Sequence, residues 1–104
     1  MQNRIDKAFA RARAAKSAAF MPFLTAGDPD LATTGALIEE MARQGADMVE
    51  LGIPYSDPVA DGPTIQASYV RALEKGFKVA QVFDMVKELR TRCEVPILTM
   101  VSFS

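Results

Sequence analysis

Apolar residues follow two different spacings along the chain, and the spacing separates predicted strands from predicted helices. Apolar runs too short for helices, bounded by turn-forming residues, predict buried strands at residues 19–24, 48–52 and 96–101. Longer stretches predict helices at residues 3–15, 29–44, 63–76 and 79–92. The predicted order is therefore helix, strand, helix, strand, helix, helix, strand.

Apolar side chains at helical spacing mark the faces that we expect to be buried. They are Ile5, Phe9 and Ala12 in the first helix, Leu31, Leu37, Ile38 and Met41 in the second, and Val79, Val82, Phe83, Val86 and Leu89 in the last. Asp28 followed by Pro29 is typical of a helix start, with the aspartate as the N-cap. Gly45 is a good terminator for the second helix.

Alternation of apolar strands with helices indicates an α/β fold with a parallel sheet covered by helices. Doubly wound sheets and (β/α)₈ barrels both fit this pattern. The element order alone does not choose between them.

Two carboxylates near the second predicted strand are the best candidates for chemistry. Glu50 interrupts the apolar strand, and Asp61 follows in a turn-rich loop. Burial on both faces of a parallel sheet is expected to raise the pKa of Glu50, which makes it a proton donor near neutral pH. Asp61, in a more polar loop, is expected to stay ionised. The pair suits acid–base catalysis.

Each candidate residue also has a purely structural interpretation. Glu50 could be a buried ion-pair partner, and Asp61 a turn former in Asp-Gly-Pro. Phe23 and Ile65 fit a core as well as a pocket wall. The residue types alone leave these alternatives open.

Composition narrows the function classes. The 104 residues carry a net charge of −1, with 12 basic and 13 acidic side chains, which favours neither nucleic acid nor an anionic membrane surface. No apolar run approaches the roughly 20 residues of a membrane span. The chain has no histidine and a single cysteine, Cys93, so we expect no metal site and no internal disulfide.

Three long motifs resemble the tryptophan synthase alpha subunit family. They are the run from Met21 to Pro29 (MPFLTAGDP), the run from Glu50 to Pro58 (ELGIPYSDP) and the run from Ala60 to Gln66 (ADGPTIQ). The similarity extends from about Arg4 to Met100. Motifs of this length are specific.

The resemblance implies a fold and a reaction. It implies a partial (β/α)₈ TIM barrel, with residues 1–104 as the N-terminal helix and first three strands of a single barrel domain and the remainder absent. The family cleaves indole-3-glycerol phosphate to indole and glyceraldehyde 3-phosphate without a cofactor. Glu50 would act on the indole ring carbon and Asp61 would hold the indole N–H, while Phe23 and Ile65 would contact the indole.

The resemblance also implies a partner. In the family, a beta subunit that carries pyridoxal phosphate receives indole within an alpha2beta2 heterotetramer, and the loop with Asp57 and Pro58 meets it. The implied location is the cytoplasm. The residues after the third strand, Met100 to Ser104, depart from the tyrosine and asparagine usual in the family, which bears on contact with the partner.

Length separates two hypotheses. A (β/α)₈ enzyme needs about 250 residues, and its phosphate site usually follows strands 7 and 8. We therefore expect this segment to belong to a larger lyase and to be inactive alone. The alternative is a non-catalytic barrel fragment that self-associates or binds a beta-type subunit. A different phosphate-sugar lyase or isomerase is a weaker option.

Overall fold

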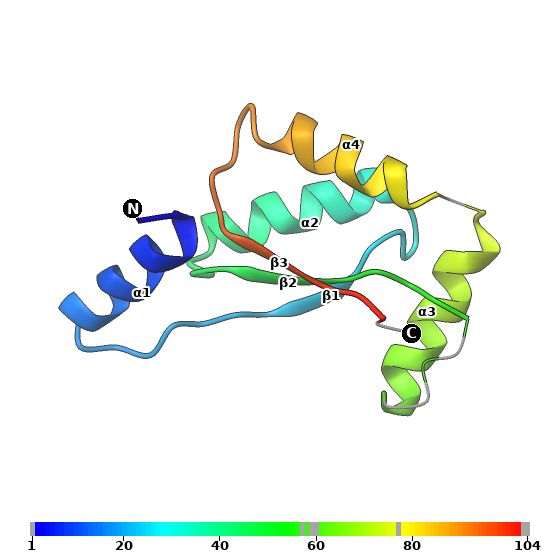
Figure 1. Ribbon diagram of the computed structural model, residues 1–104, viewed down its shortest axis with the longest axis horizontal. Helices are drawn as coiled ribbons and strands as arrows, with labels where there is room; N and C mark the ends of the chain where they lie inside the picture. The colour runs from blue at the N-terminus through cyan, green and yellow to red at the C-terminus, as the bar shows by residue number, and fades with distance from the viewer. Residues whose placement is uncertain (1, 57, 59–60, 77, 103–104) are drawn as a thin grey trace.

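The computed structural model describes residues 2–56, 58, 61–76 and 78–102, and it has the element order predicted from the sequence (Figure 1). The helices and strands are α1 (Arg4–Ala14), β1 (Phe23–Thr25), α2 (Leu31–Arg43), β2 (Val49–Gly52), α3 (Pro63–Glu74), α4 (Val79–Leu89) and β3 (Ile97–Met100). Within the described residues, no helix combines the length and apolar character that crossing a membrane requires.

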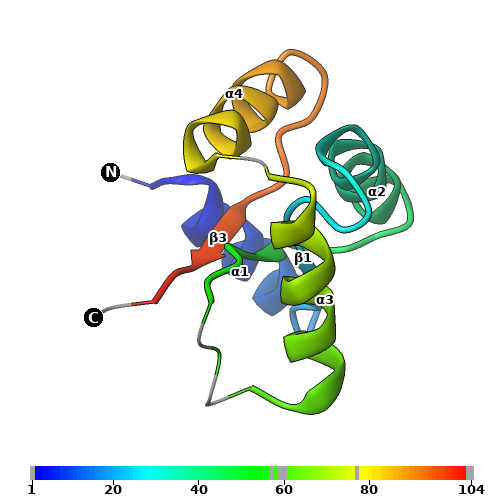
Figure 2. The ribbon, with the colours of Figure 1, turned by 90° about the vertical axis from the view of Figure 1, so that its right-hand side faces the viewer.

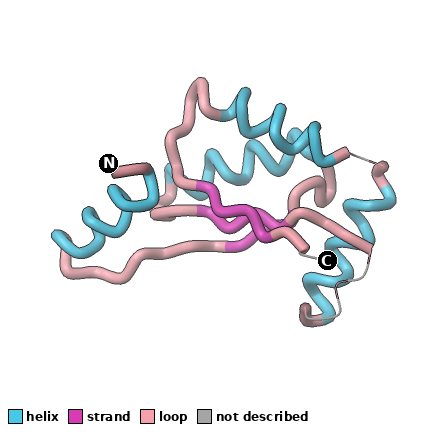
Figure 3. Tube along the Cα trace, viewed as in Figure 1, coloured by secondary structure: helices cyan, strands magenta, loops and turns pink. Residues whose placement is uncertain are grey.

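The sheet has three parallel strands in the order β1-β2-β3, which confirms the predicted parallel arrangement. Its strands are short, and extended loop segments lead into them (Figure 3). Phe23 lies beside Glu50 in the register, and Glu50 lies beside Leu98. The carboxyl ends of the three strands therefore meet at one edge of the sheet.

The main hydrophobic core lies between the sheet and two helices. Helices α2 and α4 lie together on one side of the sheet, whereas α3 lies beyond the carboxyl ends of the strands (Figures 1 and 2). The fully buried members of this core are Ala26, Ile38, Val49, Leu51, Val82 and Leu89, each with 0% exposure. This apolar layer fixes the position of β2, and hence of Glu50, relative to the helices.

Three helix faces differ in part from the prediction. Val79 and Phe83 on α4 are 50% and 60% exposed, because the helix packs through Val82, Leu89 and the partly buried Met85 and Val86 instead. Phe9 on α1 and Leu37 on α2 are likewise exposed, because Ala8 and Ile38 face inward there. A broad apolar stripe predicts a helix, but it does not fix which residues of the stripe face the core.

The start of α2 also differs from the prediction. The N-cap is Asp30, whose carboxylate accepts a hydrogen bond of 2.7 Å from the backbone N–H of Thr33. Asp28 instead accepts two hydrogen bonds from Arg71 of α3, at 3.1 and 2.9 Å. Asp28 thus ties the turn after β1 to α3, and the prediction of an Asp28 cap is wrong.

The first strand is shorter than predicted. β1 begins at Phe23, and the preceding Phe20 and Met21 are 62% and 41% exposed. Phe20 nevertheless stays tied to the chain before β2, since its backbone N–H donates to the Asp47 carboxylate at 2.7 Å and its carbonyl accepts from the Asp47 N–H at 2.9 Å. The segment is extended but lies outside the ladder of the sheet.

Candidate active site

The two faces of the sheet have different surroundings. Leu24 and Leu51 lie side by side in the register and point into the core formed with α2 and α4. Side chains alternate along a strand, so Phe23, Glu50 and Leu98 share the opposite face. All three are partly buried. The candidate carboxylate therefore stands between two apolar side chains on the face that α2 and α4 do not cover.

Glu50 is half-buried rather than enclosed. The prediction that Glu50 is enclosed within a sheet buried on both faces is wrong. Among the described residues, α2 and α4 cover only one face of the three strands (Figure 1). The backbone around Glu50 is well held, since its N–H donates to the Pro22 carbonyl at 2.9 Å. The residue as a whole is partly exposed.

Two side chains converge above Gly52 on this face. Gly52 ends β2, two residues beyond Glu50, and lies in register with Thr25. A methyl group placed on its Cα would lie 2.6 Å from Cζ of Phe23 and 2.8 Å from the hydroxyl oxygen of Tyr69. Only a glycine leaves room for both side chains here. The Phe23 ring and the Tyr69 hydroxyl thus meet above the end of β2, next to Glu50.

Tyr69 brings α3 into the site. It is 2% exposed, and its ring lies 5.6 Å from that of Tyr55 at an interplanar angle of 58°. Burial raises the pKa of Tyr69, and the negative charges of Asp61 and Glu50 raise it further. The phenol therefore stays neutral at physiological pH, and both candidate carboxylates act on it electrostatically.

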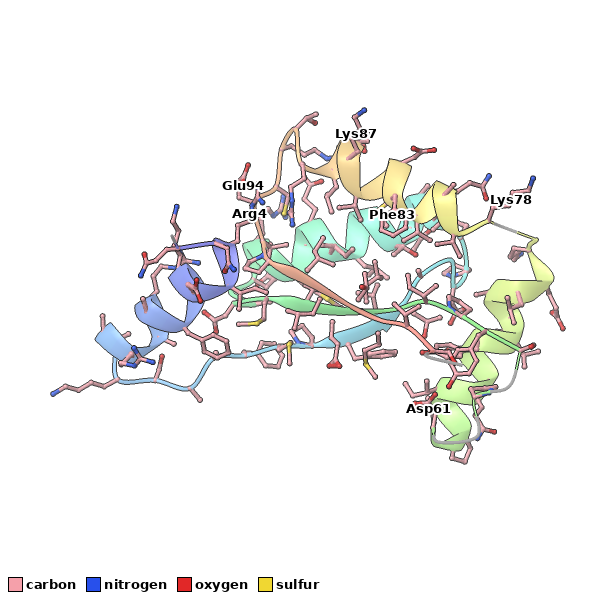
Figure 4. The ribbon with its side chains drawn as sticks, viewed as in Figure 1. Arg4, Asp61, Lys78, Phe83, Lys87 and Glu94 are labelled. Carbon is pink, nitrogen blue, oxygen red and sulfur yellow. The ribbon has the colours of Figure 1, made fainter. Side chains whose placement is uncertain are left out.

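Asp61 lies just before α3. It is half-buried, its backbone N–H donates to the Pro58 carbonyl at 3.2 Å, and its carbonyl accepts from the side-chain amide of Gln66 at 2.7 Å. Gly62 is the N-cap, and Pro63 occupies the first turn. Figure 4 shows Asp61 at the start of α3, at the end of the molecule where the strands terminate. The loop thus places this carboxylate on the same side of the molecule as the carboxyl ends of the strands.

The remaining predicted residues fall into different places. Ile65 is partly buried in the first turn of α3, four positions before Tyr69, so the two share a helix face. Pro58 is partly buried in the loop. Asp57 lies outside the described residues. The structure therefore brings Phe23 beside Glu50 in the sheet. Ile65 lies on α3 and Asp61 lies in the loop before α3, at the end of the molecule where the strands terminate (Figure 4).

Hydrogen bonds fix α3 against β1. The hydroxyl groups of Thr25 and Ser68 lie 2.6 Å apart, and both residues are buried. Ser68 also donates to the Ile65 carbonyl at 2.7 Å. The Asp28–Arg71 ion pair, which raises the pKa of Arg71, adds a second link one turn further along the helix. These contacts hold Tyr69 in place over Gly52.

Sequence reasoning did not identify Gly52 or Tyr69 as site residues. Two signals were available, namely the two-residue spacing from Glu50 to Gly52, which keeps one strand face, and the four-residue spacing from Ile65 to Tyr69. Neither spacing shows that the two segments meet. That contact depends on how α3 packs on β1.

Comparison with known proteins gives a consistent family assignment. The family model described as tryptophan synthase alpha chain matches residues 9–104. A curated relative, the tryptophan synthase alpha chain of Geobacter sulfurreducens, is 54% identical over 98 residues, which are 94% of this chain and 37% of the relative. The chain thus spans little more than a third of that relative.

Solved structures agree in fold. The crystal structure of tryptophan synthase subunit alpha from Legionella pneumophila superposes with a TM-score of 0.91 at 40% identity, covering 96% of this chain and 38% of that one. A Pyrococcus furiosus structure, described as the tryptophan synthase a2b2 complex, matches with a TM-score of 0.77 at 45% identity, covering 83% of this chain and 34% of that one. The three strands and their helices are the predicted partial (β/α)₈ barrel.

Proposed function

The chain belongs to the tryptophan synthase alpha chain family, and from this membership we propose that it supplies the catalytic carboxylates of an indole-3-glycerol phosphate lyase. The reaction is a retro-aldol cleavage to indole and glyceraldehyde 3-phosphate. Residues 1–104 are the N-terminal part of a single barrel domain in this proposal, and the parts that bind the phosphate lie in the rest of the barrel.

One observation carries the proposal. Glu50 lies beside Phe23 on the sheet face that α2 and α4 leave open, next to the edge where the three strands end. Active sites of (β/α)₈ enzymes form at the carboxyl ends of the strands. A carboxylate flanked by an aromatic ring at that edge suits an aromatic substrate that needs proton transfer.

Glu50 is the proposed acid–base group. Cleavage begins when a proton is added to the indole ring carbon that bears the glycerol chain. The adjacent carbon–carbon bond then breaks, and its electron pair returns to the ring. The neighbouring hydroxyl of the chain becomes the aldehyde as its proton passes to the carboxylate of Glu50, which has just given its own proton to the ring. Glu50 delivers the proton to the ring carbon, and it lies between Phe23 and Leu98 on the face of the sheet that α2 and α4 leave open.

Asp61 is the proposed partner of the indole nitrogen. Protonation of the ring carbon leaves positive charge on the N–H, and a carboxylate that accepts this hydrogen bond stabilises that charge. Phe23 and Ile65 are the proposed apolar contacts of the indole ring. Both side chains are only partly buried, so each has exposed surface that a ligand can contact.

A beta-type subunit is the proposed protein partner. The Pyrococcus furiosus relative is described as part of an a2b2 complex. By analogy, the loop with Asp57 and Pro58 contacts a beta subunit that receives indole, and pyridoxal phosphate belongs to that subunit. The alpha chain itself needs no cofactor in this scheme.

A segment exchange tests the proposal. Residues 1–104 would replace the matching segment of the Geobacter sulfurreducens alpha chain to give a chimeric alpha chain, and indole and glyceraldehyde 3-phosphate would be measured after addition of indole-3-glycerol phosphate. The expected result is release of both products in equal amounts, with loss of release in the Asp61→Asn chimera. A chimera that folds but releases no indole would contradict the proposal, and a different product would favour another lyase.

A further inference from the structure

Tyr69 is a buried residue whose hydroxyl lies above Gly52 and has no role in the proposed reaction described above. Its hydroxyl oxygen lies 2.8 Å from the point where a Gly52 methyl would be, on the strand face that carries Glu50. The Phe23 ring, the proposed indole contact, approaches the same point at 2.6 Å. The hydroxyl therefore lies beside Phe23, the proposed contact of the indole ring.

The hydroxyl of Tyr69 has no hydrogen-bond partner among the described residues, although the residue is only 2% exposed. The nearby hydroxyls of Thr25 and Ser68 bond to each other instead. A phenol O–H is a single donor, and a ligand or water can accept its hydrogen bond where no described side chain does. This donor is thus free for a bound molecule.

The chemistry of the proposed substrate indicates which of its atoms can accept a hydrogen bond from Tyr69. The indole ring offers an N–H donor and no oxygen, so all oxygen acceptors of indole-3-glycerol phosphate lie on its glycerol phosphate chain. The phenol is held in its neutral, donating form by burial and by the charges of Asp61 and Glu50, which raise its pKa. A neutral donor beside Glu50 matches the hydroxyl oxygens of that chain.

Resting on the proposed function, we propose that Tyr69 is a catalytic residue that donates a hydrogen bond to the glycerol chain of the substrate, beside Glu50. It fixes the carbon–carbon bond to be broken relative to the proton donor. Tyr69 thus adds a third polar contact to the two carboxylates, from the same helix face as Ile65.

The test uses Tyr69→Phe in the chimeric alpha chain, with Tyr55→Phe as the matched control. Both changes remove one hydroxyl and keep the ring pair. One lost hydrogen bond is expected to lower kcat/KM for indole-3-glycerol phosphate about five- to tenfold in Tyr69→Phe. The dissociation constant for indole, which lacks the chain oxygens, and the thermal midpoint are expected to stay unchanged. The control should match the parent in all three measurements.

Two results would overturn the inference, and they are distinguishable. If the parent chimera cleaves the substrate and Tyr69→Phe keeps kcat/KM within twofold, Tyr69 makes no such contact and the proposed function stands. An equal loss of affinity for indole would point to a packing role and would also reject the inference. If the folded parent releases no indole, the proposed function falls and the Tyr69 inference falls with it.

Discussion

Replacing Gly52 by alanine should disturb the site more than it disturbs the fold. The added methyl would lie 2.6 Å from Cζ and 2.9 Å from Cε2 of Phe23, and 2.8 Å from the hydroxyl oxygen of Tyr69. Carbon atoms in favourable contact are about 3.5–4.0 Å apart, so the groups must separate by roughly 1 Å. The Phe23 ring is only partly buried and is able to move, whereas Tyr69 is nearly enclosed.

The expected loss of stability is modest because the Phe23 ring is able to move, whereas the expected loss of activity is larger. Overpacking in a core typically costs about 1–3 kcal/mol, and the freedom of the Phe23 ring places Gly52→Ala at about 1–2 kcal/mol of unfolding free energy. A displacement of about 1 Å in a site lowers activity by up to roughly 100-fold. The loss in kcat/KM should therefore exceed what the loss in stability explains.

Gly35→Ala is the matched control for this change. Gly35 lies inside α2, and its added methyl would lie 3.5 Å from the Met85 sulfur, an ordinary contact. Alanine is favoured over glycine in a helix by about 0.8–1 kcal/mol, so this variant should be more stable than the parent and equally active. The assay is urea unfolding of the two variant chimeras, together with indole release at saturating and limiting substrate.

The outcome that refutes the reasoning is specific. If Gly52→Ala unfolds at the parental urea concentration and keeps parental kcat/KM, Phe23 and Tyr69 do not converge above the end of β2. A loss of stability shared equally by Gly35→Ala would show that alanine is simply not tolerated in either element. The first result would remove the geometric basis for placing Tyr69 in the site.

Two further predictions concern the scaffold. Thr34 is fully buried, and its hydroxyl accepts a hydrogen bond from the Gly27 N–H at 3.0 Å. In urea titration, Thr34→Val should therefore lower the unfolding free energy by about 1–3 kcal/mol, whereas Thr33→Val should change it little. Equal effects of the two substitutions would contradict the role of this hydrogen bond. Arg4 lowers the pKa of Glu94, so the pair stabilises the folded chain above the ordinary pKa of 4.5, and this contribution is lost as the pH falls through the lowered value. The difference in thermal midpoint between the parent and Glu94→Gln should therefore shrink on acidification, and a constant difference would argue against the pair, whose side chains meet in Figure 4.

The sequence was sufficient to predict the order of elements and the parallel sheet. Short apolar runs and helical spacing are local signals, and they identify strands and helices without knowledge of the packing. Gly45 behaves as predicted, since it follows α2 with a φ of +106°, a conformation that favours glycine. The position of Glu50 in a strand was likewise evident from its apolar neighbours.

Local sequence patterns did not predict the features that depend on tertiary packing. Asp28 and Asp30 flank Pro29 and are both plausible caps, and the choice depends on Arg71, which lies 43 residues from Asp28 along the chain. The convergence of Phe23 and Tyr69 above Gly52 depends on the strand register and on the position of α3. The partial exposure of Glu50 depends on which face of the sheet the helices cover.

The central claim is that Glu50 transfers the proton that drives cleavage, and Glu50→Gln in the chimeric alpha chain tests it most directly. Glu74→Gln, at the exposed end of α3, is the matched control. We predict that Glu50→Gln lowers kcat for indole release by about 100-fold or more, within the range of general acid–base contributions, while the substrate still binds and the control keeps its rate. A Glu50→Gln chimera that retains most of the parental rate would contradict the account.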